Sequence, residues 1–359
     1  MPKKTIDLPL LFAVAALTLL GLVFVYSASF YSAKDHYGNA FFFVEKQAVG
    51  AVVGSVAMTG FCLLKPQFLQ KFWLIGVVLS VVLLALVFVP GIGIENYGAR
   101  RWIGFGGFSL QPSEIAKFAF VLFAARFMSK VDMSKFRNTL PVICVGGLFC
   151  LLIIIEPNMS ITMCMGLLML TMLFVGGMTW KHFLAVIVPV VALVPLLIVI
   201  EPYRLQRLFA FIDPWASPKG EGYQLIQSLY ALGSGGWFGV GLFNSRQKFE
   251  FLPFAESDFV FSVIGEEIGL VGCLVILALY CVIVWRGIRI AVCCKEKFTA
   301  YLSGGITAVV AIQAALNVAV VTGSIPPTGL PLPFMSFGGT SLVVFLGATG
   351  VLLSCSKNG

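Results

Sequence analysis

Four carboxylates crowd the stretch FLPFAESDFVFSVIGEEIGLVG, which runs from residue 251 to residue 272. An apolar run begins at Phe259, and the acids stand at its entrance and in its first turns: Glu256, Asp258, Glu266 and Glu267. A charged side chain in the middle of a bilayer costs at least about 2.5 kcal/mol, so such residues usually have a function. A carboxylate at this entrance could act as a general base, or it could cap a helix.

Basic residues lie in segments on the same side of the apolar runs as this entrance. Arg101 stands in NYGARRWIGFGGFSLQPSEIAKF, and Lys46 stands in FFFVEKQ. Cations on the translocated side of a membrane run against the bias that governs insertion. Each could pair with a lipid headgroup, but together they favour a cationic rim suited to a phosphate-bearing ligand. The other members of this set are Arg100, Arg204, Arg207, Lys219, Arg246 and Lys248.

A further acid–base pair, Glu114 and Lys117, follows Pro112 at the start of another apolar segment. Proline suits the first turn of a helix, and Gln111 or Ser113 could cap it. Residues three apart share a helix face, so the carboxylate and the ammonium can pair. The pair would either hold two helices together or line a polar cavity in the outer leaflet.

The apolar composition of the chain predicts the elements that position these residues. Of 359 residues, 59% are hydrophobic and 11% are charged, and the mean hydropathy is +0.99. A span needs about 20 mostly apolar residues, and it should be helical because lipid satisfies no open backbone. We therefore predict an all-α, polytopic membrane protein with about ten transmembrane helices. The segments are Leu8–Ser27, Ala48–Leu64, Phe72–Pro90, Ser113–Met128, Leu140–Ile155, Met159–Met178, Phe183–Ile200, Phe259–Trp285, Tyr301–Val321 and Ser336–Ser354.

The distribution of lysine and arginine predicts the orientation of these helices. Lys3 and Lys4 place the N-terminus in the cytoplasm, and Lys357 places the C-terminal tail there too. Residues 201–257 then form a long extracytoplasmic loop between helices seven and eight, and a loop of this length is typically functional. Residues 322–335 carry no charge and are rich in proline and glycine, which indicates an outer re-entrant segment. We treat residues 1–359 as a single membrane domain.

Several classes of site are disfavoured by the sequence. Under this topology none of the nine cysteines lies in an outer loop, and their spacing indicates neither disulfides nor a metal site. His36 and His182 are far apart, which argues against a histidine-based metal site or a Ser-His-Asp triad. GSGGWFGVG lacks the ending of a nucleotide-binding loop and indicates a close-packed turn or hinge. The net charge of +8 reflects basic residues near anionic headgroups, not nucleic-acid binding.

Two classes of membrane protein fit the buried and outer acids. A proton-coupled transporter uses buried carboxylates. A membrane glycosyltransferase instead places a base near the outer leaflet, among cations that hold a lipid pyrophosphate. The outer position of Asp258, the outer cations and the long loop favour the enzyme, and we see no inverted repeat that would favour the transporter. Glu266 and Glu267, about two turns deeper, are expected to tie their helix to its neighbours.

Six motifs in order along the chain resemble the SEDS family (shape, elongation, division and sporulation) of FtsW, RodA and SpoVE. The resemblance spans about Leu8 to Ser356, and RLQRLFAFIDPW and NSRQK look more like the FtsW and SpoVE branch than RodA. The motifs are GARRWIGFGGFSLQPSEIAK, RLFAFIDPWASP, GYQLIQSLYALGSGGWFGVGL, QKFEFLP, DFVFSVIGEEIGLVG and TGLPLPFMSFGGTSL.

This resemblance implies a multi-pass protein of the bacterial inner membrane that polymerises lipid II, an undecaprenyl-pyrophosphate-linked disaccharide pentapeptide, into β-1,4 glycan strands with inversion. A class B penicillin-binding protein and other divisome or elongasome proteins are the implied partners, and a divalent cation, magnesium or manganese, is the candidate cofactor. A lipid II flippase and a non-enzymatic scaffold are the alternatives. The family's essential aspartate falls on Asp258, the candidate base. The candidate substrate-binding residues are Lys46, Arg101, Gln111, Glu114, Lys117, Glu250 and Ser336.

The chain departs from the family pattern at two places. The family commonly reads LPEAHTDF where this chain has LPFAESDF, so Phe254 replaces a glutamate and Glu256 replaces a histidine. Its QPDLGT reads EPNMSI here, so Glu156 replaces a glutamine and Asn158 replaces an aspartate. We therefore do not carry the family's roles over to these four positions, although Asn158 could cap a helix.

Overall fold

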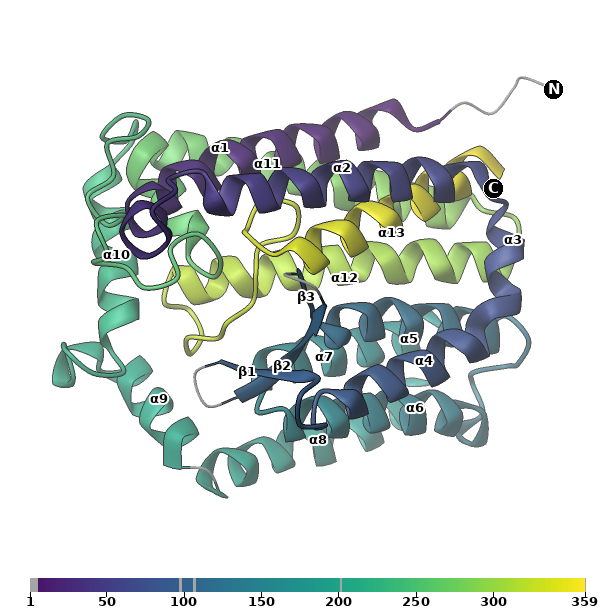
Figure 1. Cartoon of the computed structure of the whole chain (residues 1–359). Coiled ribbons are helices and arrows are strands. Elements are labelled where there is room, and N and C mark those ends of the chain that lie inside the picture. The colour runs from purple at the N-terminus through teal and green to yellow at the C-terminus, as the bar shows by residue number, and fades with distance from the viewer. Residues whose placement is uncertain (1–5, 97–98, 106–107, 201, 359) are drawn as a thin grey trace.

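The computed structural model describes residues 6–96, 99–105, 108–200 and 202–358, and its long helices pack side by side (Figure 1). Each of the ten apolar segments predicted from the sequence overlaps one of these helices. A short helix α3 (Pro66–Leu69) and a 3-10 turn η1 (Gln70–Phe72) precede α4. The long helices are α1 (Leu8–Tyr37), α2 (Phe42–Leu63), α4 (Trp73–Leu86), α5 (Pro112–Met128), α6 (Phe136–Ile155), α7 (Met159–Val175), α8 (Trp180–Ile200), α11 (Val260–Cys293), α12 (Lys297–Val321) and α13 (Gly339–Asn358).

The described helices have the length and composition of membrane spans. Seven helical segments of the described residues are long and apolar enough to cross a membrane, one of them Pro66–Leu86 across α3, η1 and α4, and α7 and the first part of α8 are shorter apolar helices. Large apolar side chains on α2, α4 and α8 are exposed, as expected for helices that face lipid. The prediction of an all-α, multi-pass membrane protein is confirmed.

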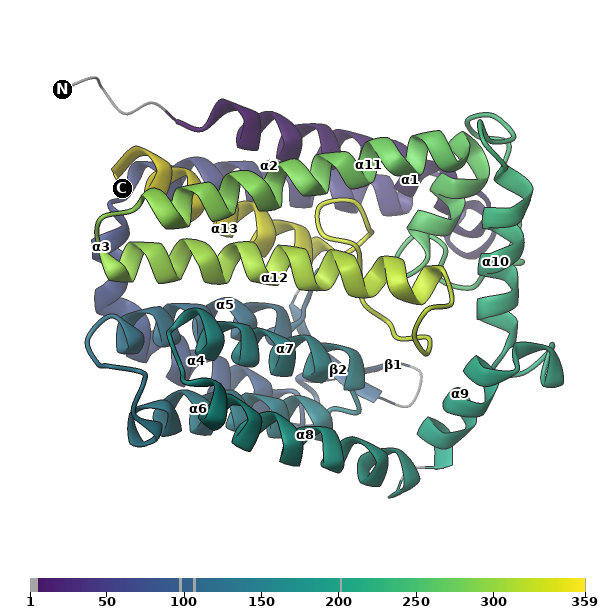
Figure 2. The same cartoon turned by 180° about the vertical axis from the view of Figure 1, so that it is seen from behind.

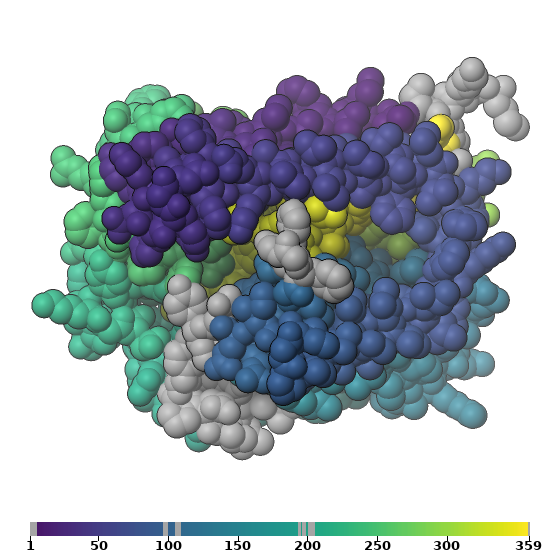
Figure 3. All heavy atoms as spheres, viewed as in Figure 1, coloured from purple at the N-terminus to yellow at the C-terminus, as the bar shows by residue number. Residues whose placement is uncertain are grey.

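Helix α13 is central to the bundle. In Figure 3 its yellow atoms lie between those of α1 and α2 and those of α4 and α5. It lies closely against α2, where a Cβ added at Gly350 would sit 2.2 Å from the carbonyl oxygen of Met58. Glycine at this position therefore lets the two backbones approach, as small residues commonly do between membrane helices.

The long loop that was predicted before α11 is partly helical. Helix α9 (Pro202–Ile212), the 3-10 turn η2 (Pro214–Ala216) and α10 (Tyr223–Gly235) stand across one end of the bundle (Figure 2). Glu201 lies outside the described residues. The start of α1 and the end of α13 lie at the opposite end of the bundle. We call the end that carries α9 and α10 the loop end.

Three short strands were not predicted. β1 (Gly93–Asn96), β2 (Ala99–Phe105) and β3 (Phe108–Leu110) pair antiparallel in that order, and residues 97–98 and 106–107 lie outside the described residues. Their apolar alternation is short and broken by glycines, so the sequence alone indicates a loop. The sheet places Arg101 on β2 and leads from β3 directly into α5.

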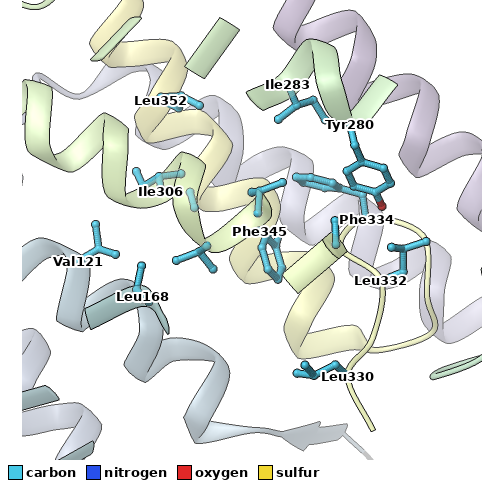
Figure 4. Packing of buried hydrophobic residues seen from close by; sticks show 14 of the residues in the cluster. Val121, Leu168, Tyr280, Ile283, Ile306, Leu330, Leu332, Phe334, Phe345 and Leu352 are labelled. Atoms are coloured by element: carbon cyan, nitrogen blue, oxygen red, sulfur yellow. The ribbon is translucent and has the colours of Figure 1, made fainter. Parts of the chain in front are cut away.

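The segment 322–335 is irregular, yet its apolar side chains are buried. Leu330, Leu332 and Phe334 are buried in the hydrophobic core; Phe334 packs near Phe345, and Leu330 lies further along the segment (Figure 4). Open backbone cannot be left unpaired among membrane helices, so other side chains must satisfy its carbonyls. The donors are Asn317 Nδ2 to Leu330 O at 2.6 Å, Gln313 Nε2 to Pro331 O at 2.9 Å, and the Tyr280 hydroxyl to Pro333 O.

Helix α11 is interrupted at Gly269, whose φ of 66° is in the left-handed region that favours glycine. The break exposes backbone groups that pair with the glycine-rich segment after α10. The Val240 N–H donates to the carbonyl of Glu266 at 2.9 Å, and the Leu270 N–H donates to the carbonyl of Gly236 at 2.9 Å. The prediction of a close-packed turn in GSGGWFGVG is thus confirmed; its role as a hinge stays a prediction.

Glu266 and Glu267 fasten the loop end to α11. The Glu266 carboxylate accepts from the backbone N–H of Arg246 at 2.9 Å and from the Ser245 hydroxyl. Glu267 accepts from the hydroxyl of Ser27 on α1 at 2.5 Å. Both acids are buried, and they serve as packing partners, as expected.

Candidate functional site

Asp258 lies two residues before α11, at the junction of three segments. Its backbone carbonyl accepts from Nδ2 of Asn317 on α12 at 2.9 Å. A Cβ added at Gly329 would lie 2.9 Å from Oδ2, so the backbone of segment 322–335 passes directly beside the carboxylate. The side chain is half-buried. Packing from α12 and segment 322–335 therefore fixes the position of this acid at the loop end.

The surroundings of Asp258 favour its protonated form. Burial raises the pKa of its carboxyl to about 7, and the nearby charge of Glu256 adds to the rise. Arg101 and Arg207 act in the opposite direction. Burial also raises the pKa of Glu256. A carboxyl whose pKa lies near the operating pH suits a general base, and perturbed acids of this kind cluster at functional sites.

The charges of two arginines, which lie on separate elements, act on the carboxyl of Asp258. Arg101, on β2, donates from Nε to the carbonyl of Glu156 at 3.4 Å and from Nη2 to the carbonyl of Pro157 at 2.5 Å. Arg207, on α9, donates from Nη1 to the carbonyl of Pro327 at 3.3 Å. The fold therefore gathers two cations around one acid from segments that are far apart in the sequence.

The pair of Glu114 and Lys117 is fully buried. Lys117 Nζ donates to Glu114 Oε1 at 2.9 Å and also to Gln313 on α12, and the Ser341 hydroxyl on α13 donates to Glu114 Oε2 at 3.0 Å. The pair thus joins α5 to α12 and α13. These contacts support the structural alternative raised by the sequence, while substrate binding by either residue stays a prediction.

The other predicted substrate-binding residues are placed differently. Ser336 is buried, and its hydroxyl accepts from the Leu332 N–H at 2.8 Å. The backbone N–H of Gln111 donates to the Thr340 hydroxyl at 3.2 Å. Lys46 is exposed, with its ammonium 4.1 Å from the centre of the Phe42 ring. Among the contacts described for the chain, none joins these residues to Asp258.

Glu250 belongs to an exposed group with Asp35 and His36. One potential ligand atom from each residue lies within 4.8 Å of the other two. His36 Nδ1 lies 3.5 Å from Glu250 Oε1 and also contacts the carbonyl of Ser32 at 3.0 Å. Within the described residues this is the group best spaced for a metal, but exposed acids often cluster without one, so we assign no ion to it.

The expected cationic rim is only partly present. Lys248 is buried, where its ammonium donates to the carbonyl of Phe243 and lies 3.6 Å from Glu267. Arg100 is exposed and pairs with Glu95 at 3.1 Å. The side chain of Arg204 lies outside the described residues. The spacing of Gln313 and Asn317 on one helix face predicts interhelical hydrogen bonds, but the sequence did not indicate that Asn317 bonds the backbone of Asp258.

Comparison with known proteins defines the class of this membrane protein. A family sequence model described as "Cell cycle protein", covering FtsW, RodA and SpoVE, matches residues 8–359. The chain therefore belongs to the FtsW/RodA/SpoVE family.

Its similarity to individual relatives extends over nearly the whole chain. It is 39% identical to stage V sporulation protein E of Bacillus subtilis, over 99% of this chain and 98% of that protein. It is 38% identical to the probable peptidoglycan glycosyltransferase FtsW of Geobacter metallireducens, over 98% and 94%. The predicted similarity to the FtsW and SpoVE branch is confirmed.

Solved structures share the fold. One, described as "Structural coordination of polymerization and crosslinking by a peptidoglycan synthase complex", aligns with a TM-score of 0.81 and 28% identity over 98% of both chains. The rod shape determining protein RodA of Thermus thermophilus aligns with a TM-score of 0.72 and 26% identity, over 98% of this chain and 97% of that one.

Proposed function

We propose that the chain is a peptidoglycan glycosyltransferase that polymerises lipid II, with Asp258 as its general base. One observation carries the proposal: Asp258 has a carboxyl of raised pKa, close to Arg101 and Arg207, at a junction fixed by α12 and segment 322–335. The names of the Geobacter relative and of the solved peptidoglycan synthase complex support the same chemistry.

The reaction uses these residues as follows. The 4-hydroxyl of the acceptor sugar attacks the anomeric carbon of the donor and inverts it, forming the β-1,4 bond, while Asp258 accepts the hydroxyl proton. The bond from the anomeric carbon to the undecaprenyl pyrophosphate breaks, and its electron pair leaves with the phosphate oxygen. Arg101 offsets the charge that develops there, and Lys46 and Lys117 are the further proposed cations.

The rate should depend on pH through Asp258. The base is active when ionised, and its pKa of about 7 means that the ionised fraction increases as pH rises through that value. We therefore expect polymerisation to increase with pH around about 7 and to fall tenfold per unit well below it. The measurement is the initial rate of lipid II consumption across a pH series. A rate that stays flat across this range would contradict the assignment of Asp258.

A divalent cation, magnesium or manganese, is part of the proposal. Mg²⁺ usually takes one or two carboxylates and completes its shell with water and substrate phosphates. We expect chelation with EDTA to stop polymerisation and added Mg²⁺ or Mn²⁺ to restore it, as measured by glycan length on gels. Undiminished glycan synthesis in excess chelator would contradict this part of the proposal.

The proposal also includes the setting of the enzyme. We place it in the bacterial inner membrane with both termini in the cytoplasm, beside a class B penicillin-binding protein and other divisome or elongasome proteins. A vesicle assay with labelled lipid II tests the activity directly. Glycan formation supports the enzyme, and movement of lipid II across the vesicle without polymer supports a flippase. If neither polymer nor movement is observed, the result supports a scaffold.

A further inference from the structure

Glu156 is a buried acid that the proposed reaction does not use. It follows the last residue of α6 and has no exposed surface. Within the described part of the chain, neither oxygen of its carboxyl has a hydrogen-bond partner. A polar group in this position is costly to bury, and an ionised carboxylate is far more costly than a neutral one. The position of Glu156 therefore needs an explanation beyond packing.

Arg101 provides that explanation. Its guanidinium donates to the carbonyls of Glu156 and Pro157 at 3.4 and 2.5 Å, so it lies against the backbone of this acid without bonding its carboxyl. The charge of Arg101 acts on both Glu156 and Asp258. One arginine is thus close to the candidate base and to an acid without a hydrogen-bond partner.

The neutral form of Glu156 is the stable one at neutral pH. Burial raises the pKa of its carboxyl to about 8, against the opposing effect of Arg101. Among the described residues, Arg101 is the group whose charge acts on the carboxyl of Glu156. The pair of Glu114 and Lys117 on neighbouring α5 bonds to itself, to Gln313 and to Ser341, and makes no hydrogen bond to Glu156. α7 contributes the uncharged Asn158, which caps its own helix.

We propose that Glu156 is a positioning residue for Arg101: in its neutral form it leaves the guanidinium to an anionic phosphate ligand, and after losing its proton it competes for that guanidinium. An ionised carboxylate forms strong, often bidentate, pairs with arginine, so a deprotonated Glu156 draws Arg101 toward itself. The inference rests on the proposed function, because the ligand that competes with Glu156 for Arg101 is the pyrophosphate of the substrate or product.

The test is binding of a polyprenyl pyrophosphate, which requires no turnover. It is measured in an Asp258→Asn background, so that Asp258 itself does not titrate. We expect the dissociation constant to rise about tenfold between about pH 7 and about pH 9. A change of this size corresponds to the loss of about one hydrogen bond to a charged group. In Asp258→Asn/Glu156→Gln the rise should be less than about twofold, because glutamine keeps the shape of the acid but cannot ionise.

Two controls make the outcome decisive. Asp258→Asn/Arg101→Gln should bind weakly at both pH values, because the guanidinium that Glu156 competes for is absent. Titration of the probe itself is the same for all variants and cancels in the comparison. If Glu156→Gln keeps the tenfold rise, the inference fails while the proposed function stands. If the probe binds none of the variants at either pH, the proposed phosphate site fails and the inference fails with it.

Discussion

Replacing Asp258 by asparagine is expected to abolish glycan polymerisation, with a loss of at least about a hundredfold in rate. Asparagine has nearly the same shape and leaves the backbone bond from Asn317 in place, so the junction should persist. It cannot accept the proton of the acceptor hydroxyl, which removes the general base. The measurement is glycan length and yield from labelled lipid II with the purified variant, together with its melting temperature in detergent.

Glu256→Gln is the matched control for this prediction. It neutralises an acid two residues away whose charge raises the pKa of Asp258. This variant should therefore remain active, and the pH at which its rate increases should move to a lower value. Full-length glycan from Asp258→Asn would refute the role of Asp258. Loss of activity in both variants, with normal melting temperatures, would instead indicate that the site needs both acids.

The helices and the position of the candidate base could be predicted because each depends on local sequence. Lipid imposes helical structure on every long apolar segment, so composition alone placed α1, α12 and the others. Asp258 could be recognised as a candidate site residue because an acid directly before an apolar run is rare. The cap on α7 was also local: Asn158 Oδ1 accepts from the Ile161 N–H at 3.3 Å.

The rest depends on contacts between distant segments, which periodicity does not reveal. Arg101 and Glu156 are 55 residues apart, and nothing in either local sequence indicates that they meet. Lys248 looked like an outer cation but lies beside Glu267, because the loop folds back onto the break in α11. The strand pairing around Arg101 was hidden for a different reason: the apolar alternation of these strands is short and broken by glycines.

The buried pair on α5 leads to the largest expected effect on stability. Lys117→Met should lower the free energy of unfolding by about 3–5 kcal/mol, because it leaves the carboxylate of Glu114 buried without its cation. The Ser341 hydroxyl remains as a partner of Glu114, but it carries no charge to replace the ammonium. The measurement is the apparent melting temperature of the purified protein in detergent.

Two further variants separate the buried charge from other effects of this substitution. Glu114→Gln/Lys117→Met removes both charges, so it should recover much of the lost stability, since the cost comes mainly from the unpaired ion. Arg100→Gln breaks the exposed pair with Glu95 and should change the melting temperature little. Equal destabilisation by Lys117→Met and Arg100→Gln would contradict the prediction. A folded double variant that no longer polymerises lipid II would show that Glu114 or Lys117 also serves the substrate, whereas an active one would restrict the pair to joining α5, α12 and α13.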